Sequence, residues 1–104
     1  MDMVKSMLRE ERAHASEVRD HYAAELEKLP RGALVRKRIH GREYLYMMRR
    51  EGRKVKTDYV GPVSDERAAR IAGDIEKRRH YEQMLRDVEK KIRYLEKVIN
   101  VNTV

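Results

Sequence analysis

The chain contains no cysteine, no phenylalanine and no tryptophan, and only two of its 104 residues are proline. Without cysteine it can form neither a disulfide nor a thiolate metal site. No apolar run approaches the roughly 18 residues that a membrane-spanning helix needs, and no segment resembles a signal peptide. We therefore expect a cytoplasmic protein that does not contact a membrane.

Large apolar side chains are also scarce, whereas charged side chains are abundant. Leucine, isoleucine and valine together number 22, and 41% of the residues are charged. Such a composition lies near the boundary between globular and disordered chains. We expect a single domain over residues 1–104, with an elongated fold and a small core that self-association could complete.

The net charge of +7 is concentrated in the middle of the chain. Residues 1–30 carry a net charge of −2 and residues 63–104 carry +2. Residues 31–62 contain ten basic and three acidic side chains, and so carry +7. The excess charge therefore predicts a local positive field and not a uniformly basic surface.

Residues 1–30 have the pattern of a helix. Leu8, Ala15, Tyr22 and Leu29 recur every seven residues, although acidic side chains interrupt the adjoining row. The sequence LPRG, which begins at Leu29, is a strong stop signal because proline cannot continue a helix.

Residues 33–61 change to a period of two, with glycine at the end of each run, at Gly41, Gly52 and Gly61. Runs of β-branched and aromatic residues separated by such turns predict a three-stranded antiparallel meander. Alternation gives it one apolar and one basic face. The apolar face would carry Tyr44, Tyr46, Met48, Val55, Thr57 and Tyr59, and the other face would carry Leu45, Met47, Arg49, Lys54 and Lys56.

Residues 64–100 predict a long helix of roughly 50 Å, at 1.5 Å per residue. Ser64 is a suitable N-cap, and Asp65 and Glu66 follow it in the first turn, where acidic side chains suit the helix dipole. Gly73 lies inside this helix, which close backbone packing or a kink would explain. The apolar stripe comprises Ala68, Ile71, Ile75, Tyr81, Leu85, Val88, Ile92, Leu95 and Ile99, with Arg78 in its one gap.

Together these segments predict an α+β fold. The N-terminal helix and the long C-terminal helix would form an antiparallel helical hairpin, with the meander between them in sequence. A homodimer or a partner protein along the distal half of the long helix is the alternative way to bury its stripe. Residues 101–104 are expected to form a loose tail.

The sequence gives little support for an enzymatic function. The four histidines, His14, His21, His40 and His80, do not show the spacings of three or four that a helical metal pair needs. There is no glycine-rich phosphate loop and no recognisable nucleophile. We expect no catalytic residues, no metal site and no cofactor.

The basic meander is the best functional signal. Crowding of like charges on a compact sheet is unfavourable, and an anionic ligand would relieve it; a nucleic-acid backbone is the commonest such ligand. Two other readings stay open, because basic side chains also protect edge strands from aggregation and could bind an acidic protein. The candidate binding residues are Arg36, Lys37, Arg38, Arg42, Arg49, Arg50, Arg53, Lys54 and Lys56. Within this set we expect Arg36, Arg38, Arg49, Lys54 and Lys56 to contact phosphates, and Arg49 or Arg50 to reach bases.

The tyrosines of the meander have two possible roles. Tyr44, Tyr46 and Tyr59 could stack on bases if they faced outward, as on single-strand binders. In a chain without phenylalanine and tryptophan we expect them instead to form the core, with their hydroxyls reaching water.

A segment of the meander resembles a pattern of small uncharacterised bacterial and archaeal proteins, G-x-x-Y-x-Y…REG-K-V-K…Y-[IV]-G, set between two helices. The matching residues are Gly41, Tyr44, Tyr46, Arg50, Glu51, Gly52, Lys54, Val55, Lys56, Tyr59, Val60 and Gly61. The segment is more loosely similar to the three-stranded arm-type DNA-binding domain of tyrosine recombinases, and such meanders also occur in mobile-element proteins. That resemblance implies a sheet set into a DNA groove.

The sequence thus favours a small nucleic-acid-binding protein, with DNA as the expected partner, that acts through its basic sheet. The alternative is a non-enzymatic interaction module, an adaptor or antitoxin-like partner, that binds an acidic protein through the sheet and a helical seam.

Overall fold

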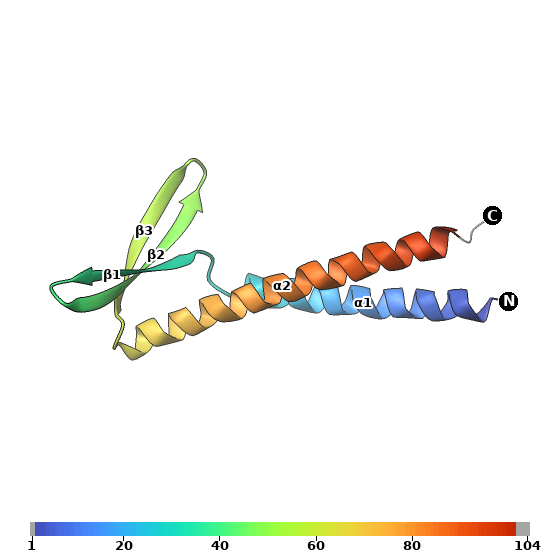
Figure 1. Ribbon diagram of the computed structural model, residues 1–104, viewed down its shortest axis with the longest axis horizontal. Coiled ribbons are helices and arrows are strands. Elements are labelled where there is room, and N and C mark those ends of the chain that lie inside the picture. The colour runs from blue at the N-terminus through green and yellow to red at the C-terminus, as the bar shows by residue number, and fades with distance from the viewer. Residues whose placement is uncertain (1, 102–104) are drawn as a thin grey trace. The chain divides into compact units, whose positions relative to one another are not determined.

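A computed structural model describes residues 2–101 of the chain (Figure 1). It confirms the α+β fold, with two helices and an antiparallel sheet in the expected order. The expected loose tail lies outside the described residues from position 102 onward, whereas Val101 is the last residue of the second helix. The elements are α1 (Met3–Glu27), β1 (Ala33–Ile39), β2 (Arg42–Glu51), β3 (Lys54–Pro62) and α2 (Glu66–Val101).

The chain divides into two compact units. One contains α1 together with α2 from His80 onward, and the other comprises Leu29–Arg79, that is, the meander and the first part of α2. That residues 1–104 form one folding domain stays a prediction. Across the described residues, no helix is both long and apolar enough to cross a membrane.

Helix α1 begins and ends where local chemistry predicts. The Asp2 carboxylate accepts hydrogen bonds from the backbone N–H groups of Val4 (3.0 Å) and Lys5 (3.3 Å), which would otherwise lack partners at a helix N-terminus. The helix ends at Glu27 with Lys28 as its C-cap, immediately before the LPRG sequence.

Within its unit, α1 packs against the distal part of α2, with the two helices antiparallel (Figure 1). Ala15 is buried against Val88 and Ile92, and the rings of Tyr22 and Tyr81 lie 5.8 Å apart. The distal part of the predicted stripe of α2 is therefore covered by α1 of the same chain. This confirms the helical hairpin.

Polar contacts fill the interruptions in both apolar stripes. Glu11, which interrupts the row on α1, forms an ion pair with Lys91 of α2. Arg78, which occupies the gap in the stripe of α2, donates from Nη1 to the backbone carbonyl of Leu29 at 3.0 Å, and both residues belong to the second unit.

The meander has the strand order β1-β2-β3, and two-residue turns join its strands. His40 (φ 50°) and Gly41 (φ 80°) both have positive φ, as a type I′ turn requires. Gly52 (φ 62°) takes the first central position of the second turn, as in type II′. The sequence prediction of the strands and turns is therefore confirmed.

One β-bulge interrupts the second hairpin. Leu45 pairs with Gly61 and Tyr46 pairs with Tyr59, so Val60 is the extra residue between them. The bulge resets the alternation of β3, so that Tyr59 shares a face with Tyr46 while Gly61 shares the opposite face with Leu45.

The N-cap of α2 is not Ser64, as the sequence predicted, but the next residue. The helix begins at Glu66, and the Asp65 carboxylate accepts from the backbone N–H of Arg67 at 3.0 Å. Asp65 is therefore the N-cap, and Ser64 lies one residue outside. A turn in which the Asp65 N–H donates to the Pro62 carbonyl (2.9 Å) delays the helix by one residue.

Of the two explanations expected for Gly73, close backbone packing and a kink, the first is wrong. No atom comes within 4 Å of the position that a Cβ would take there, so close packing does not require glycine at this point of α2.

Candidate nucleic-acid interface

Strand pairing divides the meander into two faces. Residues that pair across strands point to the same side, and neighbours along a strand point to opposite sides. We call the side that carries the tyrosines the open face and the other side the helix-side face. The open face comprises Ala33, Val35, Lys37, Ile39, Arg42, Tyr44, Tyr46, Met48, Arg50, Val55, Thr57, Tyr59 and Pro62. The helix-side face comprises Leu34, Arg36, Arg38, Glu43, Leu45, Met47, Arg49, Glu51, Lys54, Lys56, Asp58 and Gly61.

The helix-side face packs against the first part of α2. Leu45 is only 4% exposed, and Ala68 and Ile75 of α2 are buried in the same unit. A Cβ on Gly61, which pairs with Leu45, would lie 3.3 Å from the Asp65 carboxylate and 3.9 Å from the Ala68 side chain. The sheet thus approaches α2 closely at this point, and glycine is required there.

This arrangement corrects the role expected for the tyrosines. The predicted grouping of Tyr44, Tyr46 and Met48 with Val55, Thr57 and Tyr59 is confirmed by the strand register. However, the helix covers the side of Leu45, so the tyrosines are not the core of the sheet. Alternation alone defines two faces, and it does not show which of them a helix will cover.

The three tyrosines form a cluster on the open face. The rings of Tyr46 and Tyr59 lie 5.4 Å apart edge to face, and those of Tyr44 and Tyr59 lie 6.2 Å apart. Tyr59 remains 57% exposed. Desolvation, followed by the neighbouring tyrosines and the Asp65 carboxylate, raises the pKa of Tyr59, so its hydroxyl remains protonated at neutral pH.

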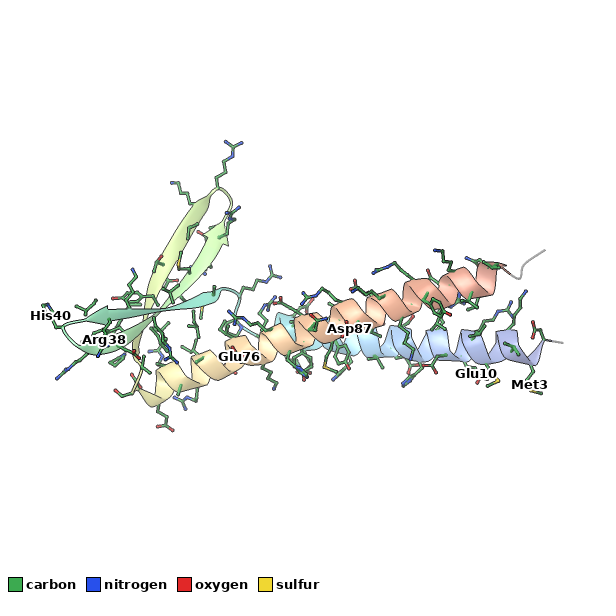
Figure 2. The ribbon with its side chains drawn as sticks, in the orientation of Figure 1. Met3, Glu10, Arg38, His40, Glu76 and Asp87 are labelled. Atoms are coloured by element: carbon green, nitrogen blue, oxygen red, sulfur yellow. The ribbon has the colours of Figure 1, made fainter. Side chains whose placement is uncertain are left out.

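The nine candidate basic residues do not share one surface. Arg36, Arg38, Arg49, Lys54 and Lys56 lie on the helix-side face; Lys37, Arg42 and Arg50 lie on the open face; and Arg53 lies in the turn between β2 and β3. Figure 2 shows Arg38 and His40 at the first hairpin. Because side chains alternate along a strand, a run such as Arg36-Lys37-Arg38 supplies cations to both sides.

Carboxylates partly neutralise the cations of the helix-side face. Diagonal ion pairs join Arg36 to Glu43 (3.8 Å), Arg49 to Asp58 (3.5 Å) and Lys56 to Glu51 (2.7 Å). Three of the five residues expected to contact phosphates thus have an internal partner. Such exposed pairs are weak, generally below about 1 kcal/mol, so a ligand could replace them.

The open face carries cations without carboxylates. All three acidic residues of the described meander, Glu43, Glu51 and Asp58, lie on the helix-side face. Among residues 2–101, Arg42 and Arg50 form no ion pair. The ammonium group of Lys37 lies 4.7 Å from the centre of the Tyr46 ring, which is a cation–π distance.

A hollow of about 490 Å³ lies at the end of the open face where β2 begins. It is lined by Arg42, Glu43, Tyr44, Pro62, Val63 and Ser64. It therefore places a guanidinium group and an aromatic ring beside a space large enough for a planar heterocycle.

Sequence reasoning missed this separation of charge, although a signal for it was present. Along β2, Arg42, Tyr44 and Arg50 are all at even positions, whereas Glu43 and Glu51 are at odd positions. The chemistry available on the open face is binding, through aromatic rings and cations. In the part of the chain that the structure describes, no cluster of three or more acidic or histidine side chains could hold a metal ion.

Fold and surface together define a class of small α+β protein, in which a meander with an aromatic and cationic face comes between two helices in the sequence. Residues 6–70 match the family DUF6788, a domain of unknown function. Because this match covers more than half of the chain, the chain belongs to that family. The matched region includes most of α1, the whole meander and the first turns of α2. No curated protein and no solved structure matches the chain significantly.

Proposed function

We propose that this protein binds nucleic acid, with DNA as the expected form, through the basic meander. The observation that carries the proposal is the location of positive charge that has no partner. Within residues 2–101, five of the nine candidate cations form no ion pair, and a sixth, Lys37, contacts only a tyrosine ring. The five are Arg38, Arg42, Arg50, Arg53 and Lys54.

Protection of sheet edges does not by itself account for this distribution. Basic side chains on β1 and β3 could block the pairing of edge strands with other chains. Arg42 and Arg50 belong to β2, where each pairs with one neighbouring strand only, Arg42 with Ile39 of β1 and Arg50 with Val55 of β3. Edge protection does not explain why these two cations share a face with the tyrosine rings and with no acidic residue of the strands, whereas contact with a polyanion does.

A second candidate function is an interaction module for an acidic protein. Ile39, Met48 and Val55 are exposed on the same face as Arg42 and Arg50, and protein interfaces commonly combine apolar and cationic side chains. Because α1 covers the distal stripe of α2, such a partner would bind to the sheet and not along that seam. In both cases we propose binding without catalysis.

The test is a titration with duplex and single-stranded oligonucleotides over a range of salt concentration. The meander variant replaces four unpaired cations by glutamine: Arg38, Arg42, Arg50 and Lys54. The control variant has the same change of net charge on exposed positions of α2: Lys77, Lys90, Arg93 and Lys97. If the meander binds phosphates, the slope of log K against log salt falls in the meander variant by about 0.7–0.9 unit for each of these four cations that contacts a phosphate.

The control variant should retain a slope close to that of the wild type. The proposal is wrong if the two variants lose affinity equally, or if the wild-type protein binds neither form of nucleic acid. Tight binding to poly-glutamate with no binding to oligonucleotides would instead establish the interaction module.

A further inference from the structure

We infer that the open face binds single-stranded nucleic acid, with bases stacked on Tyr44, Tyr46 and Tyr59 and phosphates held by Lys37, Arg42 and Arg50. This inference rests on the proposed function and specifies its ligand. It starts from an arrangement that folding alone does not explain. The meander has no phenylalanine or tryptophan, and its three tyrosines all lie on the side away from α2.

Part of the open face is exposed to an extent that is unusual for a protein with so few large apolar residues. Tyr59 is 57% exposed and Val55 is 53% exposed, whereas Tyr44 and Tyr46 are half-buried and Leu45 on the other face is 4% exposed. A contiguous exposed patch with aromatic members generally marks a binding surface. The patch is available for a ligand in the described structure, since the helix of the same unit covers the opposite side of the sheet.

The order of side chains along β2 suits an extended strand. Arg42, Tyr44, Tyr46, Met48 and Arg50 follow one another on the open face, so two aromatic rings lie between two unpaired guanidinium groups. The two arginines are eight residues apart, which corresponds to roughly 26 Å along a β-strand. That length matches a site of about four nucleotides, the lower end of the range for single-strand binders.

Stacking favours single strands over duplexes for a physical reason. In a duplex the faces of the bases are occupied by their neighbours, and only phosphates and groove edges are accessible. In a single strand each base has a free face for an aromatic ring. The open face offers rings and cations, and the hollow beside Tyr44, which Glu43 also lines, has room for a further base. An acidic peptide would use the cations and leave the rings without a specific role.

The test compares oligothymidine and oligouridine strands of about 12 nucleotides, their duplexes, and an abasic strand of the same length. The variant Tyr46→Leu/Tyr59→Leu should bind single strands about tenfold or more weakly, because stacking is lost. Its salt slope should not change, since no cation is removed. The variant Tyr46→Phe/Tyr59→Phe keeps the rings and should bind like the wild type.

Tyr94→Leu provides the matched control, because Tyr94 of α2 is 66% exposed and lies outside the meander. It should leave binding unchanged. The abasic strand should bind the wild type about as weakly as the normal strand binds the leucine variant. Circular dichroism will show that each variant is folded, and the phenylalanine variant separates a loss of stacking from a loss of fold.

The inference is overturned if the folded leucine variant binds as the wild type does, or if the duplex binds more tightly than the single strand. In those cases a meander-dependent salt slope would still support nucleic-acid binding in general. Absence of binding to every oligonucleotide would overturn the inference and the proposed function together. A preference for oligothymidine or oligouridine over its abasic counterpart supports the inference.

Discussion

The backbone conformation of His40 limits which residues can occupy the first turn of the meander. Its φ of 50° lies in the left-handed region, which residues other than glycine seldom adopt, although asparagine, aspartate and histidine do so more often than the rest. Histidine is tolerated there because the tight turn to Gly41 requires positive φ at both positions. The first hairpin therefore contains a local strain that substitution can relieve or increase.

The substitution His40→Asn should stabilise the protein by about 0.5 kcal/mol, because asparagine followed by glycine is the preferred pair for this turn. His40→Val should destabilise it by about 1–2 kcal/mol, since a β-branched side chain is strongly disfavoured at positive φ. Urea unfolding followed by circular dichroism measures both changes. Equal stabilities for the two variants would contradict the assigned turn.

Leu45, which is buried, identifies the helix-side face as the buried face of the sheet. Leu45→Ala should lower the free energy of unfolding by about 2–4 kcal/mol, because it opens a cavity between the sheet and α2. Met48→Ala, on the open face, should change it by about 0.5 kcal/mol or less. The same urea experiment compares the two, and a larger effect at Met48 would mean that the faces are assigned the wrong way round.

Among the elements, α2 contains a glycine that its surroundings do not require. Nothing lies within 4 Å of a Cβ built on Gly73. Gly73→Ala should therefore stabilise the protein by about 0.5–1 kcal/mol, through the higher helix propensity of alanine. Gly61→Ala is the contrasting control and should destabilise, because its φ is +151° and its Cβ would meet Asp65. Thermal unfolding that ranks the two variants in the reverse order would refute this account.

We expect the pairing of α1 with α2 to depend on pH through Glu11. A hydrogen bond and charge attraction from Lys91 lower the pKa of Glu11 below its usual value. Its stabilising contribution is therefore fully present above the pKa of the unfolded chain, about 4.3, and is lost as pH falls through the lower pKa of the folded state.

Wild type and Glu11→Gln should thus differ more in unfolding free energy at pH 7 than at pH 3. Glu10→Gln is the control, because Glu10 is an exposed neighbour without an ion pair in the described structure (Figure 2). Unfolding measured across this pH range would count against the pairing if both variants followed the same curve.

Periodicity predicted both helices, the three strands and their turns, because each depends on neighbours in sequence. It also predicted which residues share a face with Tyr46. It could not show that α2 covers the side of Leu45, or that Asp65 caps the helix and Val60 forms a bulge, because those features depend on contacts made only after the chain has folded.

For the molecule as a whole, the account depends on where charge is left without a partner. The net charge is +7, and the segment 31–62 alone carries that amount. Ion pairs reduce the field on the helix-side face, whereas the open face keeps its cations beside a cluster of aromatic rings. The candidate residues could thus be read from the sequence, but their division between two unlike faces required the strand register.

The most direct test compares two charge variants of the meander. Arg42→Gln/Arg50→Gln removes two unpaired cations from the open face, and Arg38→Gln/Lys54→Gln removes two unpaired cations from the helix-side face. The measurement is the affinity of each folded variant for a labelled single strand at fixed salt. The account predicts that the open-face variant loses roughly tenfold in affinity and the other variant much less. Equal losses, or a larger loss for the helix-side variant, would contradict it.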